Sequence, residues 1–404
     1  AIFVVVVGAL AGLYPSFFLA SFKPAQVLKG KLRAGFRSSK LRNGLVLLQF
    51  VISITLITCT LVVQKQLNFM RSRELGFDKE NVICIDNAHE LPSQEAFINS
   101  LKQMPGIQLV GASTFRPIDD YDGTAVVTEE DKENRKLVNF TNADYDYLDA
   151  AGFKLVAGRN FSRDISADSD AVILNETAAR FLFEGDALNK KVYYSGEHTV
   201  VGIIKDFNFE SLKSEIKPLA IFLRSNQRFL SVRLAPGDYR STIASIQNLW
   251  KQQQTSVPFS YTFLDENYND LFQEESKLST IFGLFTALAL FIACLGLLGL
   301  AAYMADRRSK EISVRKVLGA TVSQIVVLLS TDFVKIILVA FIVAAPLAYI
   351  IMKQWLDGFA FKTELSLWIL SVGGLVVLAT ALLAVSYQSI RAALINPVKS
   401  LKEE

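Results

Sequence analysis

The fold of this chain is decided by the segment Leu278–Met304, which reads LSTIFGLFTALALFIACLGLLGLAAYM. A helix needs about 20 mostly apolar residues to cross the hydrocarbon core of a bilayer, which is about 30 Å thick. This segment is long enough, and it carries no acidic or basic side chain. It therefore predicts a transmembrane helix, and the chain is expected to be an integral membrane protein.

Further apolar segments on both sides of this one predict a multi-pass protein. The composition agrees, because 51% of the residues are hydrophobic and only 20% are charged, a balance shifted away from that of soluble domains. The other predicted spans are Ala1–Phe22, Asn43–Val63, Val322–Met352 and Leu365–Ile390.

The span Val322–Met352 differs from the others because it contains Asp332 and Lys335. Charges inside a membrane are costly and often functional. Because the two residues are three apart on a helix, they are expected to form an intramembrane charge pair, either as a structural tie between helices or as a force-transmitting switch. Pro346 is expected to kink this span, since proline removes a helix hydrogen bond.

Basic residues set the predicted orientation of the spans. Residues 23–42 carry seven basic and no acidic side chains, and the loop 305–321 is also rich in arginine and lysine, so both are expected to be cytoplasmic. Residues 64–277 carry 24 basic and 32 acidic side chains, a formal charge of −8. This acidic segment is therefore placed outside the cytoplasm, and the C-terminus inside it.

The outer segment is long enough to fold around a core of its own, and its pattern alternates strands with helices. A strand at Asn81–Asp86, a helix at Ser93–Met104 and a strand at Gln108–Thr114 form one βαβ unit. A second βαβ unit follows at 229–264, after an insert at about 115–228. The predicted fold class is an α-helical membrane protein with an α+β extracytoplasmic domain, made of two βαβ units and an inserted subdomain.

The sequence offers no catalytic or metal-binding constellation. It contains neither a Gly-x-x-x-x-Gly-Lys-[Ser/Thr] phosphate loop nor a Gly-x-Ser-x-Gly nucleophile motif. Three cysteines do not make a disulfide framework, and two histidines make a zinc site an unfavourable interpretation. The chain is therefore expected not to be an enzyme, and it is expected to bind no metal and no cofactor.

A sequence repeat links the two ends of the chain. Seven of the nineteen residues at 11–29 recur 373 positions later, including Tyr14, Pro24 and Lys29 at Tyr387, Pro397 and Lys402. The simplest interpretation is a duplication, in which residues 1–30 end a first copy with one span. The second copy would then comprise a basic segment and span at 31–63, the outer domain at 64–277, three spans at 278–390 and a tail at 391–404.

The loop after Leu278–Met304 reads RRSKEISVRKVLGAT at Arg307–Thr321. On a helix, Val314, Val317, Leu318 and Thr321 would form an apolar stripe, and Glu311 with Arg315 an i,i+4 ion pair. From composition alone, this is also what a basic cytoplasmic loop would look like.

The sequence of this loop resembles the R-x-x-E-I-x-x-R-[KR]-x-L-G-A-T signature of the FtsX/MacB family of ABC-transporter permeases. The outer domain is also similar to the periplasmic core domain of that family, and the resemblance covers nearly the whole chain. It rests on YLDAAGF at 147–153, AGRNF at 157–161, AVILNE at 171–176, VVGIIKDF at 200–207 and the ending NPVKSL at 396–401.

The resemblance implies a permease of the bacterial inner (plasma) membrane, with residues 64–277 in the periplasm. Members of the family couple ATP hydrolysis to motion of the periplasmic domain, a mechanism called mechanotransmission, for efflux or extraction of a substrate. ATP and Mg²⁺ would belong to a separate dimeric ABC ATPase. The coupling residues implied by the match are Arg307, Arg308, Lys310, Glu311, Arg315, Lys316 and Gly319.

Under this interpretation, the basic face of 307–321 would dock on the ATPase and its apolar stripe would lie against the spans. Other implied partners are a first permease half or a second permease, membrane lipids, and in some systems a periplasmic adaptor and an outer-membrane duct, but no nucleic acid. Two alternatives stay open. One is a regulator of a cell-wall hydrolase or a peptide sensor that uses the same motion, and the other, less favoured, is a secondary transporter.

Overall fold

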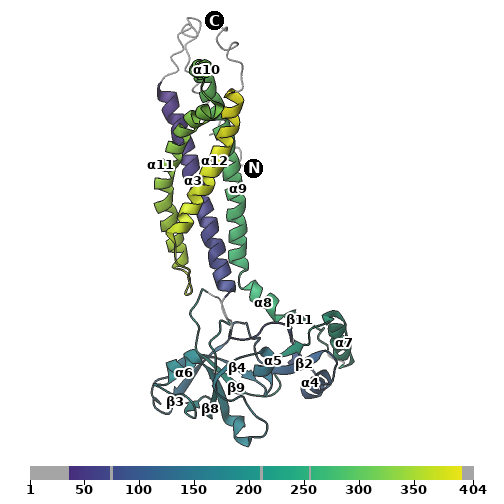
Figure 1. Ribbon diagram of the computed structural model, residues 1–404. Helices are drawn as coiled ribbons and strands as arrows, with labels where there is room; N and C mark the ends of the chain where they lie inside the picture. The colour runs from purple at the N-terminus through teal and green to yellow at the C-terminus, as the bar shows by residue number, and fades with distance from the viewer. Residues whose placement is uncertain (1–35, 73–75, 210–212, 254–255, 394–404) are drawn as a thin grey trace, which may run out of the picture. The chain divides into compact units, whose positions relative to one another are not determined.

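The structure, a computed structural model, describes residues 36–72, 76–209, 213–253 and 256–393 (Figure 1). The predicted span Ala1–Phe22, the first member of the sequence repeat and the tail at 394–404 lie outside the described residues. The chain forms two compact units, which are treated separately below. The helical unit contains 36–55, Ala287–Ala345 and 374–393, and the core unit contains Leu56–Thr286 and Pro346–Gly373.

Four helices are long and apolar enough to cross a membrane, as the sequence predicts for the described part of the chain. Each helix runs a few residues beyond the predicted apolar segment, because polar residues at the ends continue the helical hydrogen bonding. Helix α11 continues without a break through Pro346. The four helices are α3 (Phe36–Arg71), α9 (Gln273–Arg307), α11 (Val322–Leu356) and α12 (Leu367–Ala393).

The two predicted βαβ units are present and interleave in one sheet. The first is β1 (Val82–Ile85), α4 (Gln94–Lys102) and β2 (Ile107–Ser113). The second is β10 (Phe229–Leu234), α7 (Tyr239–Gln252) and β11 (Tyr261–Phe263). The strands lie in the order β11–β1–β10–β2 with every neighbouring pair antiparallel, so each βαβ unit has a strand of the other unit between its two parallel strands. This is the split βαβ arrangement of ferredoxin-like domains.

Both faces of this sheet are covered, which explains why VICI at Val82–Ile85 is apolar at every position. Ile83 and Ile85 face a core that includes Phe97 of α4 and Trp250 of α7, and these two helices lie together on one side of the sheet (Figure 1). On the other face, Cys84 belongs to a second apolar cluster. Alternation along a strand sends neighbouring side chains to opposite faces.

The insert lies between β2 and β10 and extends the same sheet, since Ser113 of β2 pairs with Ala143 of β4. Its own core packs helix α6 against the strands through residues such as Ala178, Leu182 and Phe222. The elements of the insert are β3 (Gly123–Thr128), β4 (Lys136–Ala143), α5 (Tyr147–Ala151), β5 (Leu155–Gly158), η2 (Ser166–Asp170), β6 (Ala171–Asn175), α6 (Glu176–Leu182), β7 (Lys191–Tyr193), β8 (Glu197–Ile204) and β9 (Leu219–Leu223). The remaining short elements are η1 (Ala88–Glu90) and α8 (Leu264–Asp270).

The motifs that carry the family resemblance in the core domain serve the fold. Asn175 caps α6, because its side-chain oxygen accepts hydrogen bonds from the amides of Ala178 and Leu219 at 2.8 and 2.9 Å. Asp206 accepts from the amide and hydroxyl of Thr177 in the same helix turn. Arg159 makes a bidentate ion pair with buried Asp168 at 2.6 Å, and this guanidinium lowers the pKa of the carboxyl.

Candidate coupling site and helix–domain junction

The predicted signature loop folds as a short helix, α10 (Ser309–Val317), joined to α9 at Arg308. Helical i to i−4 hydrogen bonds continue on both sides of this joint. The amide of Arg308 donates to the carbonyl of Met304, and the carbonyl of Arg308 accepts from the amide of Ile312. The Glu311–Arg315 ion pair predicted from the sequence is present at 2.8 Å, with both side chains about half exposed.

Gly319 ends α10 because its backbone adopts φ +92°, a conformation that side-chain-bearing residues rarely take. The amide of Gly319 donates to the carbonyl of Lys316, and the amide of Ala320 donates to that of Arg315. These two bonds form a Schellman motif, in which a left-handed residue closes the last turn of a helix. The glycine of the signature is therefore needed for backbone geometry.

Thr321, the last residue of the signature, starts the next helix. Its hydroxyl accepts from the amide of Gln324 at 3.4 Å, and the Gln324 side chain accepts from the amide of Thr321 at 3.0 Å. This reciprocal pair is a capping box at the N-terminus of α11. The signature thus encodes a helix, its stop and the start of the following span.

The predicted placement of the apolar stripe of α10 is wrong. Val314, Val317 and Leu318 are 50%, 69% and 80% exposed. The residue that anchors α10 is Ile312, which is buried against Ile325 and Leu329 in the first turns of α11. Because one turn of contact fixes the rotation of so short a helix, the stripe that begins at Val314 points away from the helical unit.

The predicted intramembrane charge pair has a different principal partner. Asp332 forms its close ion pair with Arg308, at 3.0 Å, while Lys335 lies at 3.9 Å. The pair thus ties the α9–α10 joint to α11, in agreement with the structural interpretation of a tie between helices. Arg308 was expected to serve ATPase coupling, but its guanidinium is engaged within the helical unit. Arg307 is exposed, Lys316 is partly buried, and the side chain of Lys310 lies outside the described part.

The core unit contains a junction that the sequence did not reveal. Gln66 of α3 is fully buried, and its amide binds the backbone of the loop between α11 and α12. The nitrogen donates to the carbonyl of Phe361 at 2.7 Å, and the oxygen accepts from the amide of Thr363 at 2.9 Å. A signal was available, because Gln66 lies on the same helical face as buried Val62, Val63 and Met70, where a polar residue needs a partner.

The same loop also binds the core domain. The amide of Ala360 donates to the carbonyl of Lys213, in the segment between β8 and β9. The ammonium of Lys213 forms an ion pair with Glu275 of α9 at 2.8 Å, and the Glu275 side chain is only 6% exposed. Burial of a paired carboxylate makes this contact more specific than a surface ion pair.

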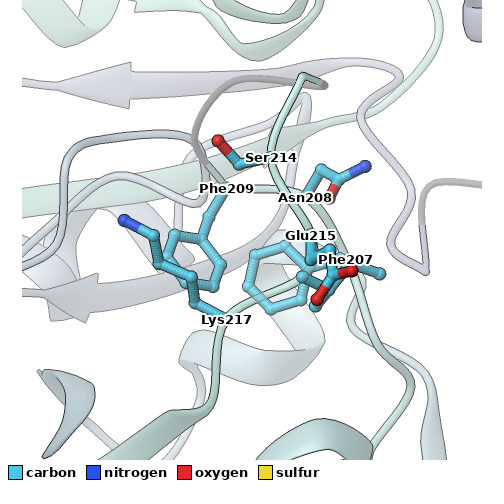
Figure 2. Close-up of a pocket in the computed structure, with 7 residues that line it drawn as sticks. Phe207, Asn208, Phe209, Ser214, Glu215 and Lys217 are labelled. Atoms are coloured by element: carbon cyan, nitrogen blue, oxygen red, sulfur yellow. The ribbon is translucent and has the colours of Figure 1, made fainter. Parts of the chain in front are cut away.

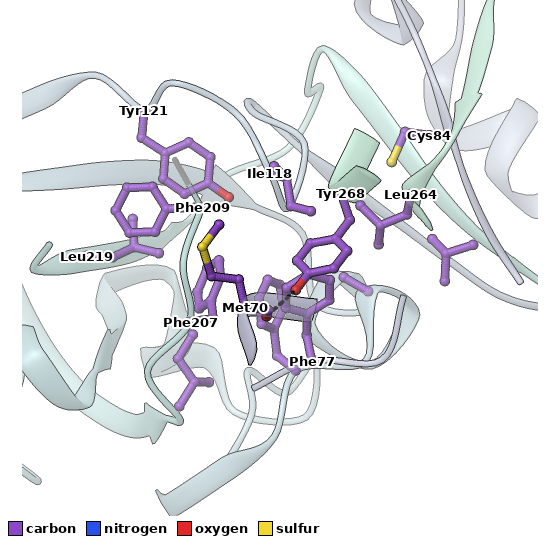
Figure 3. Close-up of a cluster of buried hydrophobic side chains, with 14 of the residues drawn as sticks. Met70, Phe77, Cys84, Ile118, Tyr121, Phe207, Phe209, Leu219, Leu264 and Tyr268 are labelled. Atoms are coloured by element: carbon purple, nitrogen blue, oxygen red, sulfur yellow. Dashed lines mark hydrogen bonds between the residues drawn. The ribbon is translucent and has the colours of Figure 1, made fainter. Parts of the chain in front are cut away.

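The core unit also contains a large apolar cluster (Figure 3). Met70, at the end of α3, lies among Phe77, Phe207 and Tyr268, and the Tyr268 hydroxyl donates to the carbonyl of Met70 at 3.3 Å. Met352 and Phe359, from the end of α11 and the loop after it, belong to the same cluster. The ends of α3 and α11, helix α8 and the insert therefore share one core in the core unit.

A small hollow lies in the described part of the core domain. The hollow lined by Phe207, Phe209 and Lys217 has a volume of about 10 Å³, room for about one water molecule (Figure 2). Within the described ranges, no group of three or more His, Cys, Asp or Glu side chains could hold a metal ion.

Two family models match this sequence. The MacB-like periplasmic core domain matches residues 45–249, just over half of the chain, and the FtsX-like permease C-terminal model matches residues 283–397. The chain belongs to the FtsX/MacB family of ABC-transporter permeases. It is accordingly a membrane protein of this permease family, with a periplasmic core domain.

A curated relative of this family member is the macrolide export ATP-binding/permease protein MacB of Chromobacterium violaceum, 24% identical over 278 residues. That match covers 64% of this chain and 42% of the relative, so the chain spans less than half the length of the curated relative it matches.

Solved structures of periplasmic regions are also similar. The periplasmic region of MacB from Actinobacillus actinomycetemcomitans is 18% identical, with 49% of this chain and 95% of that one covered and a TM-score of 0.34. A domain of a putative permease protein from Porphyromonas gingivalis is 17% identical, with 46% and 92% covered and a TM-score of 0.34.

Proposed function

We propose that this chain is the permease subunit of a mechanotransmission complex, in which a separate ABC ATPase drives motion of the periplasmic core domain. The motion would serve efflux or extraction of a substrate from the periplasm or the outer leaflet. The chain itself would carry no catalytic group and no cofactor, and ATP and Mg²⁺ would be bound by the ATPase dimer. The C-terminus and α10 would lie in the cytoplasm.

The observation that carries the proposal is the exposed surface of α10. Val317 and Leu318 are among the most exposed apolar side chains of the described structure, and they lie next to the exposed Arg315 in a helix fixed at both ends. An exposed apolar patch bordered by polar residues marks an interaction site, and arginine is enriched among the residues that contribute most to binding at interfaces. We therefore assign ATPase docking to the face with Val314, Val317 and Leu318.

The junction of the core unit supports the second half of the proposal. Gln66, Lys213 and Glu275 join the outer ends of the helices to the core domain through hydrogen bonds and an ion pair. A displacement of these helix ends would be passed to the sheet by contacts that are buried and specific. Such contacts transmit motion because a packed core has low compressibility.

The test is affinity purification of the tagged chain from its native membranes, followed by an assay for vanadate-sensitive ATP hydrolysis in the eluate. The wild type should retain an ATPase. In the double variant Val317→Asp/Leu318→Asp, the ATPase activity that co-purifies with the chain should fall at least about tenfold. Burial of two such side chains at an interface contributes about 2–3 kcal/mol to binding.

Two controls make this test specific. Leu137→Asp changes a leucine of the core domain that is 67% exposed, and it should leave ATPase retention unchanged. Arg315→Glu/Lys316→Glu tests the basic face instead. If only this variant lost ATPase activity, the docking surface would be the basic face predicted from the sequence. A wild-type eluate without ATPase activity would refute the proposal.

A further inference from the structure

The helical unit contains a cavity of about 540 Å³ between the C-terminal end of α9 and α11. A volume of this size falls in the range of roughly 300–1,000 Å³ that is usual for ligand sites. Its lining combines charged residues at the α9–α10 joint and on α11 with apolar residues of both helices. The charged ones are Arg307, Arg308, Asp332 and Lys335.

The charges that line the cavity do not balance. Arg308 and Asp332 form an ion pair at 3.0 Å and neutralise each other. Arg307 and Lys335 remain, and the Lys335 side chain is 71% exposed with its ammonium 3.9 Å from the same carboxylate. Three cations against one carboxylate give this lining a formal charge of +2, so an anion is attracted to it.

The apolar part of the lining restricts the kind of anion. Tyr303 and Met304 of α9 and Ile336 of α11 also line the cavity, and each is at least partly exposed. A simple inorganic anion makes no use of such a wall, whereas an amphiphile places a charged group among the cations and a hydrocarbon chain along it. The cavity therefore fits an amphiphilic anion.

The position of Lys335 along α11 also favours an amphiphilic anion as the ligand. Helix α11 has 35 residues and is about 52 Å long, roughly 20 Å longer than the hydrocarbon core, and Lys335 lies 13 residues, about 20 Å, from its first residue. A largely exposed lysine within a membrane-spanning helix is unfavourable unless its ammonium reaches a phosphate at the boundary of the bilayer. A lipid phosphate in the cavity would provide that partner.

We propose that this cavity binds one anionic phospholipid, with the headgroup phosphate between Arg307 and Lys335 and an acyl chain along Tyr303, Met304 and Ile336. Because Arg308 and Asp332 form the wall of the cavity, the bound lipid would also stabilise the joint between α9 and α10. This proposal rests on the proposed function in one respect only, the orientation of the chain in the membrane. That orientation makes the cytoplasmic leaflet the source of the lipid. ATPase docking is not needed for it.

The experiment is native mass spectrometry of the delipidated full chain in detergent. Three probes are titrated separately: dioleoyl-phosphatidylglycerol, dioleoyl-phosphatidylcholine and inorganic phosphate. We expect one phosphatidylglycerol per chain to bind at concentrations where the other two do not. Equal binding of phosphatidylcholine would overturn the charge argument, and equal binding of inorganic phosphate would show a soluble anion site instead.

Variants test the residues of the site. Each Lys or Arg near the membrane surface raises the affinity for an anionic lipid about fivefold, so Arg307→Gln/Lys335→Gln should weaken phosphatidylglycerol binding about 25-fold. Arg391→Gln is the matched control, because Arg391 is an exposed cation in the last turn of α12 and does not line the cavity. An equal loss in both variants would mean that the lipid binds any cationic surface of the chain.

A variant that is expected to strengthen lipid binding distinguishes loss of the proposed site from damage to the fold. Asp332→Asn removes the one carboxylate of the lining and so raises the formal charge of the lining from +2 to +3, and phosphatidylglycerol should bind more tightly. Damage to the cavity would weaken binding in this variant as well. Weaker binding in both Asp332→Asn and the double variant would therefore refute the site.

Discussion

At the scale of single residues, the pairing of Asp332 shows what a sequence can and cannot specify. Spacing of three on a helix correctly places Lys335 near the carboxylate, at 3.9 Å. It contains no information on Arg308, which comes from 24 residues earlier in the chain and makes the shorter contact. The partner was decided by the turn between α9 and α10, and that turn is a tertiary feature.

A second residue, Asp144, makes the stability of the core domain depend on pH. Burial raises the pKa of its carboxyl from 3.8 to about 6. A raised carboxyl pKa stabilises the folded state only while the group is protonated. The contribution is complete below about pH 4 and is lost as the pH rises through about 6.

We predict that Asp144→Asn raises the melting temperature of the detergent-solubilised chain at about pH 7.5 and changes it little at about pH 4. The two-unit shift corresponds to at most about 3 kcal/mol at the higher pH. Asp122→Asn, at an exposed aspartate, is the control. Equal changes in melting temperature at the two pH values would contradict the prediction. They would show that ionisation of Asp144 does not destabilise the folded chain.

At the scale of elements, α10 is a nine-residue helix, and a helix this short is not stable by itself in water. It persists here because both of its ends are fixed, at the α9 joint and at Gly319, and because Ile312 anchors it on α11. This explains why the signature combines apolar, basic and glycine positions at constant spacing. It also explains why the proposed docking face differs from the basic face predicted from the sequence, since the stripe itself does not show which side of the helix carries the anchor.

The loop between α11 and α12 is the second element with a testable contact. Gln66→Ala leaves the carbonyl of Phe361 and the amide of Thr363 without their partner, which costs about 1–3 kcal/mol when such groups stay buried. We predict faster hydrogen exchange in a peptide that covers 358–366, with a smaller effect elsewhere. Gln64→Ala, at an exposed glutamine two residues earlier, should leave that exchange unchanged.

If the exchange of this peptide stayed at the wild-type rate in Gln66→Ala, the loop would be held by its other contacts. Those contacts are the hydrogen bond from Ala360 to the carbonyl of Lys213 and the one from the Lys65 ammonium to the carbonyl of Glu364 at 3.1 Å. Gln66 would then be a satisfied buried residue without a transmitting role.

At the scale of the whole molecule, periodicity and apolar length predicted most of what the described residues show. Four spans and two βαβ units follow from runs such as 278–304 and VICI at 82–85, because burial acts on many residues at once. The strand order did not follow, since the interleaving of β1 and β10 is decided by pairings across an insert of more than 100 residues. For the same reason, neither Lys213 nor Gln66 could be matched with its partner in advance.

The proposed topology predicts the labelling of introduced cysteines. A membrane-impermeant maleimide added to intact spheroplasts should label Glu184→Cys, exposed in the core domain, but not Ser323→Cys, exposed at the start of α11. The wild type serves as the control, because Cys84 is fully buried and burial raises the pKa of its thiol to about 12. Labelling of Ser323→Cys without permeabilisation would reverse the orientation.

The pairing of β1 with β11 has a mechanical consequence. The chain enters the sheet at Val82 and leaves it at Phe263, and the register Ile83 to Phe263 puts both points at the same end of adjacent antiparallel strands. A load applied to α3 and α9 together is therefore carried by the two strands in parallel and resisted by the whole sheet in shear. Sideways separation of the same two helices would instead peel the ladder open one pair at a time, beginning at Phe263. Under the proposed function, the core domain would therefore withstand a common pull on α3 and α9 better than a splaying one.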